Sequence, residues 1–100
     1  MRIFHIVLAE NWEKYKEKEF YEDESLRSEG FIHCSFANQL GDVLKRHYDG
    51  VEKVLILEIE TEKLTSKLIN EPSANDEIYP HIYGKINLHA IVRAEEKILV

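Results

Sequence analysis

The stretch EGFIHCS, residues 29–35, places a carboxylate, a glycine, an imidazole, a thiol and a hydroxyl within one short segment. Two large apolar side chains lie between these polar groups, as expected for a strand with one buried face. Alternation along such a strand predicts that His33 and Ser35 point to one side and that Ile32 and Cys34 point to the other. We therefore expect Ile32 and Cys34 to pack in the core, and His33 and Ser35 to line a cleft.

Strands and helices are predicted on both sides of this stretch. Runs rich in β-branched and aromatic residues predict strands over residues 2–8, 31–35, 53–60, 67–71, 80–84 and 91–100. Apolar residues at helical spacing predict two main helices, over residues 12–19 and 37–48.

Shorter features connect these elements. Asn11 is predicted to cap the first helix. The segment 20–29 is expected to be a loop with one short helical turn that Gly30 ends. Another helical turn is expected to open at Thr61, and residues 71–76 are expected to form a loop.

The lengths of the connections decide the fold class. The spacers that follow Glu60 are too short for repeated βαβ crossovers, which need a dozen residues or more. The mixture of elements therefore favours a compact α+β domain over a parallel doubly wound sheet. The chain has no internal repeat, low-complexity tract or linker, so we expect one domain over residues 1–100.

The composition of the chain limits the classes of molecule that it is expected to bind. With 13 basic and 19 acidic residues, the formal net charge is −6, and no run of Lys or Arg is present. Binding of nucleic acid or of an anionic membrane relies on clustered Lys and Arg, so neither partner is expected. Cys34 is the only cysteine, which excludes an intrachain disulfide and a cysteine-based zinc motif. We expect a soluble cytoplasmic domain, and the sequence leaves its oligomeric state open.

Three of the five histidines lie in or beside apolar strands, where an unpaired polar group would be costly. They are His5, His33 and His81, whereas His47 and His89 have ordinary helix or turn contexts. Each of the three could be a satisfied, partly buried side chain bonded to a backbone carbonyl. Alternatively, the three could line one shared cleft, which is the reading that we favour.

Other arrangements of the same residues remain open but have less support. Ser35, His33 and Glu71 could form a nucleophile triad, although nothing resembles the G-x-S-x-G elbow. Three histidines and Glu71 could bind zinc, although no H-x-H or H-x-x-x-H pair is present. Cys34 is more simply a small buried hydrophobe. Trp12 and Tyr15, at helical spacing, are expected in the core.

Several motifs occur in an order that resembles one known family. They are HI at residues 5–6, a tryptophan seven residues after His5, SLRSEGFIHCS at 25–35, NEPS at 70–73 and YPHIYGKINLHAIV at 79–92. Together they resemble the family known as domain of unknown function 952 over nearly the full chain. Members of that family resemble the ADP-ribosyltransferase fold, a compact α+β unit with a split, mainly antiparallel sheet core. In active relatives the cleft at the split holds NAD.

The resemblance also implies roles for individual residues. His5 matches a first-strand position that would hydrogen-bond a ribose hydroxyl, and His33 with Ser35 matches a second position. Glu71 would stabilise positive charge on an oxocarbenium-like ribose, so these four residues are the implied catalytic set. His81 and Tyr83 are implied to bind the ligand.

The expected function is accordingly an ADP-ribosyltransferase-like domain that binds a nucleotide-like small molecule in a histidine-lined cleft. NAD is the cofactor that this resemblance implies, with transfer or hydrolysis at a ribose carbon as the reaction. A non-catalytic small-ligand module on the same fold and a small histidine metal site remain alternatives.

Overall fold

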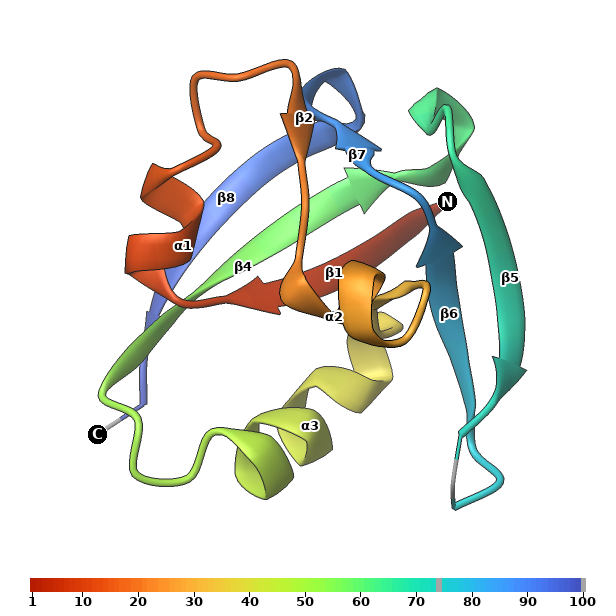
Figure 1. The fold of residues 1–100 in the computed structure, drawn as a ribbon. Coiled ribbons are helices and arrows are strands. Elements are labelled where there is room, and N and C mark those ends of the chain that lie inside the picture. Colours follow the sequence, from red (N-terminus) through yellow and green to blue (C-terminus); the bar gives the residue numbers. More distant parts are fainter. Residues whose placement is uncertain (74, 100) are drawn as a thin grey trace.

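The computed structural model describes residues 1–73 and 75–99 as a mixed α+β fold (Figure 1). Its strands are β1 (Arg2–Val7), β2 (Phe20–Tyr21), β3 (Ile32–His33), β4 (Lys53–Glu60), β5 (Lys67–Pro72), β6 (Ile78–Tyr83), β7 (Ile86–Asn87) and β8 (Ile91–Ile98). Its helices are α1 (Ala9–Glu13), α2 (Glu24–Ser28) and α3 (Leu40–His47), and its 3-10 turns are η1 (Ala37–Gln39), η2 (Thr61–Lys63) and η3 (Leu88–Ala90). The strands form two three-stranded antiparallel sheets, β1-β4-β8 and β3-β6-β5, and the short pair β2-β7.

The first sheet is centred on β4, which pairs with β1 on one edge and with β8 on the other. Ile3 lies opposite Ile59, and His5 lies opposite Leu57. The three apolar side chains of these pairs are fully buried, as the alternating pattern of both strands predicts. The predicted strands over 2–8 and 53–60 are confirmed. The predicted strand over 91–100 ends at Ile98, and Val100 lies outside the described residues.

The second sheet has one apolar face and one face rich in polar and aromatic groups. On the apolar face Ile32 lies opposite Ile82, and both are fully buried. On the other face His33 lies opposite His81. Cys34 is buried as well, so the predicted burial of the two apolar positions in EGFIHCS is confirmed.

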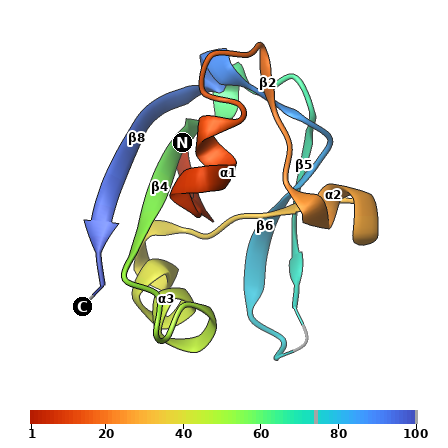
Figure 2. The same cartoon turned by 60° about the vertical axis from the view of Figure 1, so that its left-hand side comes forward.

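Within residues 1–73 and 75–99 the two sheets meet at one backbone pair. The Phe4 N–H donates to the Ser35 carbonyl at 2.9 Å, and the Ser35 N–H donates to the Phe4 carbonyl at 2.7 Å. This bridge is isolated and is not continued as a ladder, so the antiparallel core is split between β1 and β3. Figure 2 shows the two sheets side by side, with α3 at the end where β5 turns into β6.

The first helix differs from its prediction. It begins at Ala9 after an extended Leu8, and Asn11 lies inside it with its N–H bonded to the Leu8 carbonyl. The prediction that Asn11 caps a helix over 12–19 is therefore wrong. Residues 16–19 alternate Lys and Glu and offer no apolar side chain to bury, so packing does not extend the helix there.

The segment before EGFIHCS holds more structure than expected. A helical turn is present as α2, and Gly30 follows it at φ +90°, as predicted. The pairing of β2 with β7 was not predicted, because each strand is only two residues long. The helix over 37–48 is confirmed as η1 followed by α3, the turn at Thr61 as η2, and the strands over 67–71 and 80–84 as β5 and β6. Ala74, within the predicted loop, lies outside the described residues.

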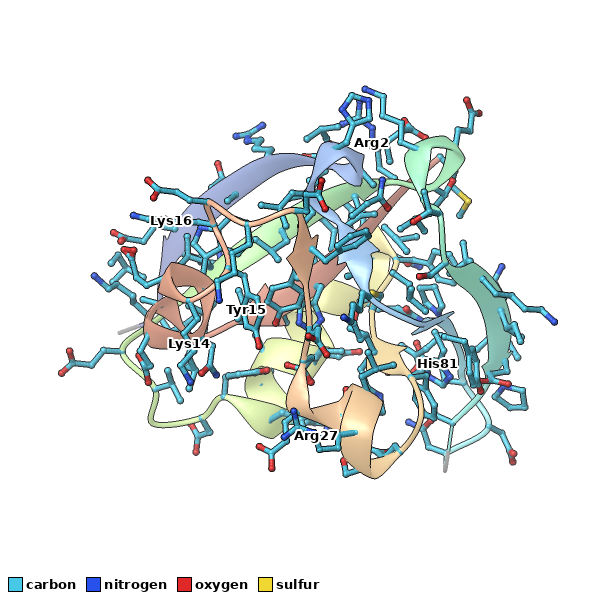
Figure 3. The ribbon with its side chains drawn as sticks, turned by 45° about the horizontal axis from the view of Figure 1, so that its top comes forward. Arg2, Lys14, Tyr15, Lys16, Arg27 and His81 are labelled. Carbon is cyan, nitrogen blue, oxygen red and sulfur yellow. The ribbon has the colours of Figure 1, made fainter. Side chains whose placement is uncertain are left out.

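Aromatic side chains close the core on the α1 side. Trp12 and Tyr15 pack against the buried cluster, which confirms their predicted place. The Tyr15 ring meets the buried Tyr21 ring edge-on at 5.4 Å, and Figure 3 shows Tyr15 beside β2. None of the helices in residues 1–73 and 75–99 is long and apolar enough to cross a membrane.

Candidate functional site

A cavity of about 740 Å³ lies at the split between the two sheets. Its walls come from β1, from the segment that joins β2 to β3, from α3 and from the β5–β6 hairpin. The side chains that matter most for its chemistry are His5, Phe31, His33, Arg46, Tyr79 and His81. Histidines from three separate strands therefore reach one cavity.

His5 is held on both sides of its ring. Its Nδ1 lies 2.6 Å from the carbonyl oxygen of His33 and its Nε2 lies 2.8 Å from the Tyr21 hydroxyl. A carbonyl can only accept, so Nδ1 carries a proton and donates it. In a continued ladder this carbonyl would pair with the backbone of β1. The His5 side chain thus supplies the hydrogen bond that is lost where the sheets part.

Tyr21 and Asp23 extend this chain of groups toward the cavity wall. Asp23 Oδ1 is 3.4 Å from the Tyr21 hydroxyl and 3.7 Å from His5 Nε2. Its other oxygen accepts the Ser25 N–H at 3.1 Å and so caps α2. The neighbouring His5 imidazole holds the pKa of Asp23 well below its usual range. Burial raises the pKa of Tyr21, so its hydroxyl remains protonated.

His81 is fixed by a carboxylate and by an aromatic ring. It is 5% exposed, and its Nδ1 lies 2.7 Å from Glu71 Oε1. The same carboxylate oxygen accepts the Tyr83 hydroxyl. The bond from Tyr83, which has the larger effect, and the bond from His81 both lower the pKa of Glu71. Glu71 is therefore a carboxylate at neutral pH. The Phe31 ring stacks on the imidazole, with 4.1 Å between centroids (His81 is labelled in Figure 3).

His33 and Ser35 also lie at the cavity. The His33 side chain is exposed, and its Nε2 lies 3.0 Å from Glu29 Oε2. Its ring meets that of His81 edge-on at 5.4 Å. Ser35 is 5% exposed, and its backbone forms the bridge between the sheets. Both residues line the cavity, as their position in EGFIHCS predicted.

The α3 wall contributes positive charge. Arg46 Nη2 donates to the Tyr79 hydroxyl at 2.6 Å, which holds the guanidinium beside β6. Tyr79 donates in turn to Glu77 Oε1 at 3.3 Å. Gln39 donates to the second oxygen of Glu77 at 2.9 Å and to the Ile78 carbonyl at 2.7 Å. A network of polar bonds thus ties α3 to the start of β6.

Not all of the predicted site residues line the cavity. His5, His33, Ser35 and His81 do. Glu71 and Tyr83 do not: Glu71 contacts the Nδ1 atom of His81, and the Tyr83 hydroxyl contacts Glu71. His47, which looked ordinary in the sequence, also lines it. Sequence reasoning missed further lining residues that only the tertiary fold brings together, among them Asp23, Arg46, Tyr48 and Tyr79. Phe31 could have been found, since alternation places it on the same face as His33.

The structure also bears on two other arrangements considered from the sequence. Within residues 1–73 and 75–99, no group of three or more His, Cys, Asp or Glu side chains is placed to hold a metal ion. Cys34 is 4% exposed, and burial raises the pKa of its thiol. A protonated, buried thiol is not a nucleophile, so the interpretation of Cys34 as a small buried hydrophobe is confirmed.

Comparison with solved structures identifies the same fold in a protein from Caulobacter crescentus. A crystal structure of protein CC0527 from Caulobacter crescentus matches with a TM-score of 0.89 at 24% sequence identity, over 100% of this chain and 89% of that one. A crystal structure of a double mutant of CC0527 gives 0.88 at 23% identity, again over 100% and 89%. The solution NMR structure of CC0527 gives 0.85 at 24% identity, over 99% and 86%. At this identity the likeness shows a shared fold.

No curated protein matches the chain in sequence. The family model described as "Protein of unknown function (DUF952)" matches residues 6–94, which include the residues named above as lining the cavity except His5. The motifs that resembled this family therefore reflect true membership. This chain belongs to the DUF952 family.

Proposed function

We propose that the cavity binds a nucleotide-type small ligand and that the chain is an ADP-ribosyltransferase-like domain acting at a ribose carbon. The observation that carries the proposal is the cavity at the split between the two sheets, with an aromatic wall, a cationic wall and carboxylates around one space. A volume of about 740 Å³ lies within the roughly 300–1,000 Å³ of small-ligand sites.

The charges around the cavity match the parts of a nucleotide. Arg46 and His47 of α3 supply donors for an anionic phosphate, and a guanidinium suits phosphate geometry particularly well. Asp23 and Glu29, on the segment before β3, supply acceptors for ribose hydroxyls. The Phe31 ring offers an apolar aromatic surface for a base.

The split core supports the ADP-ribosyltransferase-like part of the proposal. Two small sheets that meet at one bridge, with a cavity at the junction, are the arrangement implied by the sequence resemblance. The role implied for His5 needs revision, because both of its ring nitrogens are bonded within the protein. The ribose contact then falls to His33 or Ser35, which line the cavity beside it.

Ligand binding is tested by calorimetry with NAD, ADP-ribose and inorganic phosphate at pH 6 and pH 8. An unperturbed imidazole gains its charge near pH 6.5, so a histidine-lined site should bind anions more tightly at pH 6. His33→Ala should weaken binding and flatten this pH dependence, while His89→Ala, outside the cavity, should do neither. Absence of binding for all three compounds would refute the proposal.

A non-catalytic ligand-binding module is the second candidate. It is favoured by the engagement of both His5 nitrogens, which leaves the first-strand histidine no free atom for a substrate. Release of nicotinamide from NAD separates the two candidates, since only the enzyme produces it. Binding of NAD without its breakdown would select the module.

A further inference from the structure

We propose that His81 is the proton acceptor of this cavity and that Glu71 is the residue that positions it, so that the domain hydrolyses a nucleotide N-glycosidic bond. The inference rests on the proposed function, because it takes the nucleotide-type ligand as given. It reverses the roles implied by the sequence, in which Glu71 acted on the ribose and His81 only bound the ligand.

The carboxylate fixes which ring nitrogen carries the proton. Glu71 is ionised and can only accept, so His81 Nδ1 at 2.7 Å must donate. In the neutral imidazole the lone pair is then on Nε2, which is the form that a general base requires. The Tyr83 hydroxyl donates to the same carboxylate oxygen and holds it against Nδ1.

The ring is also fixed in orientation. Phe31 stacks on one face of the imidazole with 22° between the planes, and the side chain is nearly buried. With Nδ1 directed at Glu71, the opposite edge of the ring carries Nε2. No partner within hydrogen-bonding distance of Nε2 is found in residues 1–73 and 75–99, and His81 lines the cavity. The lone pair is therefore available to a molecule bound there.

The remaining carboxylates suit charge that develops on a ribose. Asp23 and Glu29 both line the cavity, and the pKa of Asp23 is held low, so its charge is present at neutral pH. Fixed negative charge stabilises an oxocarbenium-like ribose. Glu71 is not needed for this purpose, because its carboxylate is already bonded to His81 and Tyr83.

With NAD as the substrate, the proposed step is hydrolysis of the bond between the ribose and the nicotinamide. A water molecule bonds through its oxygen to the ribose C1′ next to the nicotinamide, and His81 Nε2 takes the proton that this water loses. The C1′–N bond breaks, and its electron pair stays with the pyridine nitrogen, which leaves as neutral nicotinamide. The imidazolium then releases its proton to solvent, so the products are ADP-ribose, nicotinamide and one proton.

The test compares NAD binding with nicotinamide release in wild type, His81→Asn, Glu71→Ala and His89→Gln. Asn at position 81 keeps a donor for Glu71 but has no basic nitrogen. It should bind NAD within about threefold of wild type and lose about 100-fold or more of the turnover, since general-base catalysis contributes 10²–10⁴-fold. Glu71→Ala should lose less turnover, and His89→Gln, in η3 and outside the cavity, should match wild type.

A spectroscopic readout on the wild type makes the test independent of how well the variants fold. Ring ¹⁵N chemical shifts of His81 in the wild type should report an Nδ1-protonated ring at neutral pH, and in Glu71→Ala the population should shift toward Nε2 protonation. Observation of Nε2 protonation in wild type would overturn the inference.

The possible failures are distinguishable. If wild type binds NAD but releases no nicotinamide, or if His81→Asn turns over like wild type, the inference is wrong and nucleotide binding stands. If wild type binds none of NAD, ADP-ribose and phosphate, the proposed function fails and this inference fails with it.

Discussion

The imidazole of His81 lies flat on the ring of Phe31, and this contact links β6 to the residue that precedes β3. The Phe31 ring also approaches those of His33 and Tyr83, with centroid distances of 4.8 and 5.3 Å. One aromatic side chain thus touches three of the polar residues on this face. It limits how far each of them can rotate, which keeps the cavity wall rigid.

Replacing Phe31 with Ala should release the His81 ring. Protons held over an aromatic face are shielded by its ring current, so the His81 ring signals should move downfield in Phe31→Ala. Phe20→Ala is the matched control, because Phe20 is 40% exposed and lies outside the cavity. Two-dimensional NMR of the histidine rings measures the change. Unchanged His81 signals would show that the stack is absent in solution.

Within EGFIHCS, the side chains on the buried face should contribute more to the stability of the fold than those on the cavity face. Ile32→Ala removes a fully buried side chain from the core and should cost about 2–5 kcal/mol in urea unfolding. Ser35→Ala should cost much less, because the bridge to Phe4 uses only the backbone of Ser35. A greater loss for the serine variant would mean that the two faces of this strand are assigned the wrong way round.

The Tyr21 hydroxyl should matter for stability, unlike that of Tyr15. Tyr21→Phe leaves His5 Nε2 without its partner inside the protein and should cost about 1–3 kcal/mol. Tyr15→Phe is the matched control, since this ring packs on the core but its hydroxyl has no recorded partner in the described part of the chain. We expect its unfolding free energy to change by less than about 0.5 kcal/mol. Equal effects would contradict the assigned role of the His5–Tyr21 bond.

Asp23 should make the fold sensitive to acid. The pKa of Asp23 in the folded chain is depressed below its unfolded value of about 3.9. The charged carboxylate therefore contributes its full stabilisation above about pH 3.9, and this stabilisation is lost as the pH falls from there toward the folded-state pKa. Asp23→Asn keeps a side-chain oxygen for the Ser25 N–H but loses the charge. Its unfolding free energy should be lower at pH 7 and should fall less between pH 5 and pH 3.

Urea unfolding across this pH range measures the effect. Glu24→Gln, an exposed neighbour in α2, serves as the control and should follow the wild-type profile. If the Asp23→Asn profile is as steep as that of wild type, the acid sensitivity arises from other carboxylates. Glu60 is one of these, since bonds from the N-terminal amine and then from Arg2 lower its pKa to about 2.

The sequence predicted the long strands well and the first helix badly, for physical reasons. Strands such as β4 bury one face, so their apolar alternation records the geometry of the sheet. Helix α1 has no buried residue, and its extent depends on where the chain must turn toward β2. Two-residue strands such as β2 and β7 are too short to leave a periodic signal.

The candidate site was predictable only where its residues share a strand. Alternation placed His33 and Ser35 on one side, and the motifs drew attention to His5 and His81. Nothing in the spacing shows that Arg46, on a helix, reaches the Tyr79 hydroxyl across the cavity. The pairing of Glu71 with His81 depends on the register of β5 against β6, which periodicity alone does not fix.

The single bridge at Phe4 and Ser35 has a consequence for how such a site can diversify. Ladder hydrogen bonds hold strands at a fixed separation, but at the split the spacing is set by side chains such as His5. Substitutions that face the split can therefore widen or narrow the cavity while both ladders keep their register. The size of the ligand can therefore change in evolution without a change of fold. Proteins that share this fold at 24% identity are free to bind different molecules in the cavity.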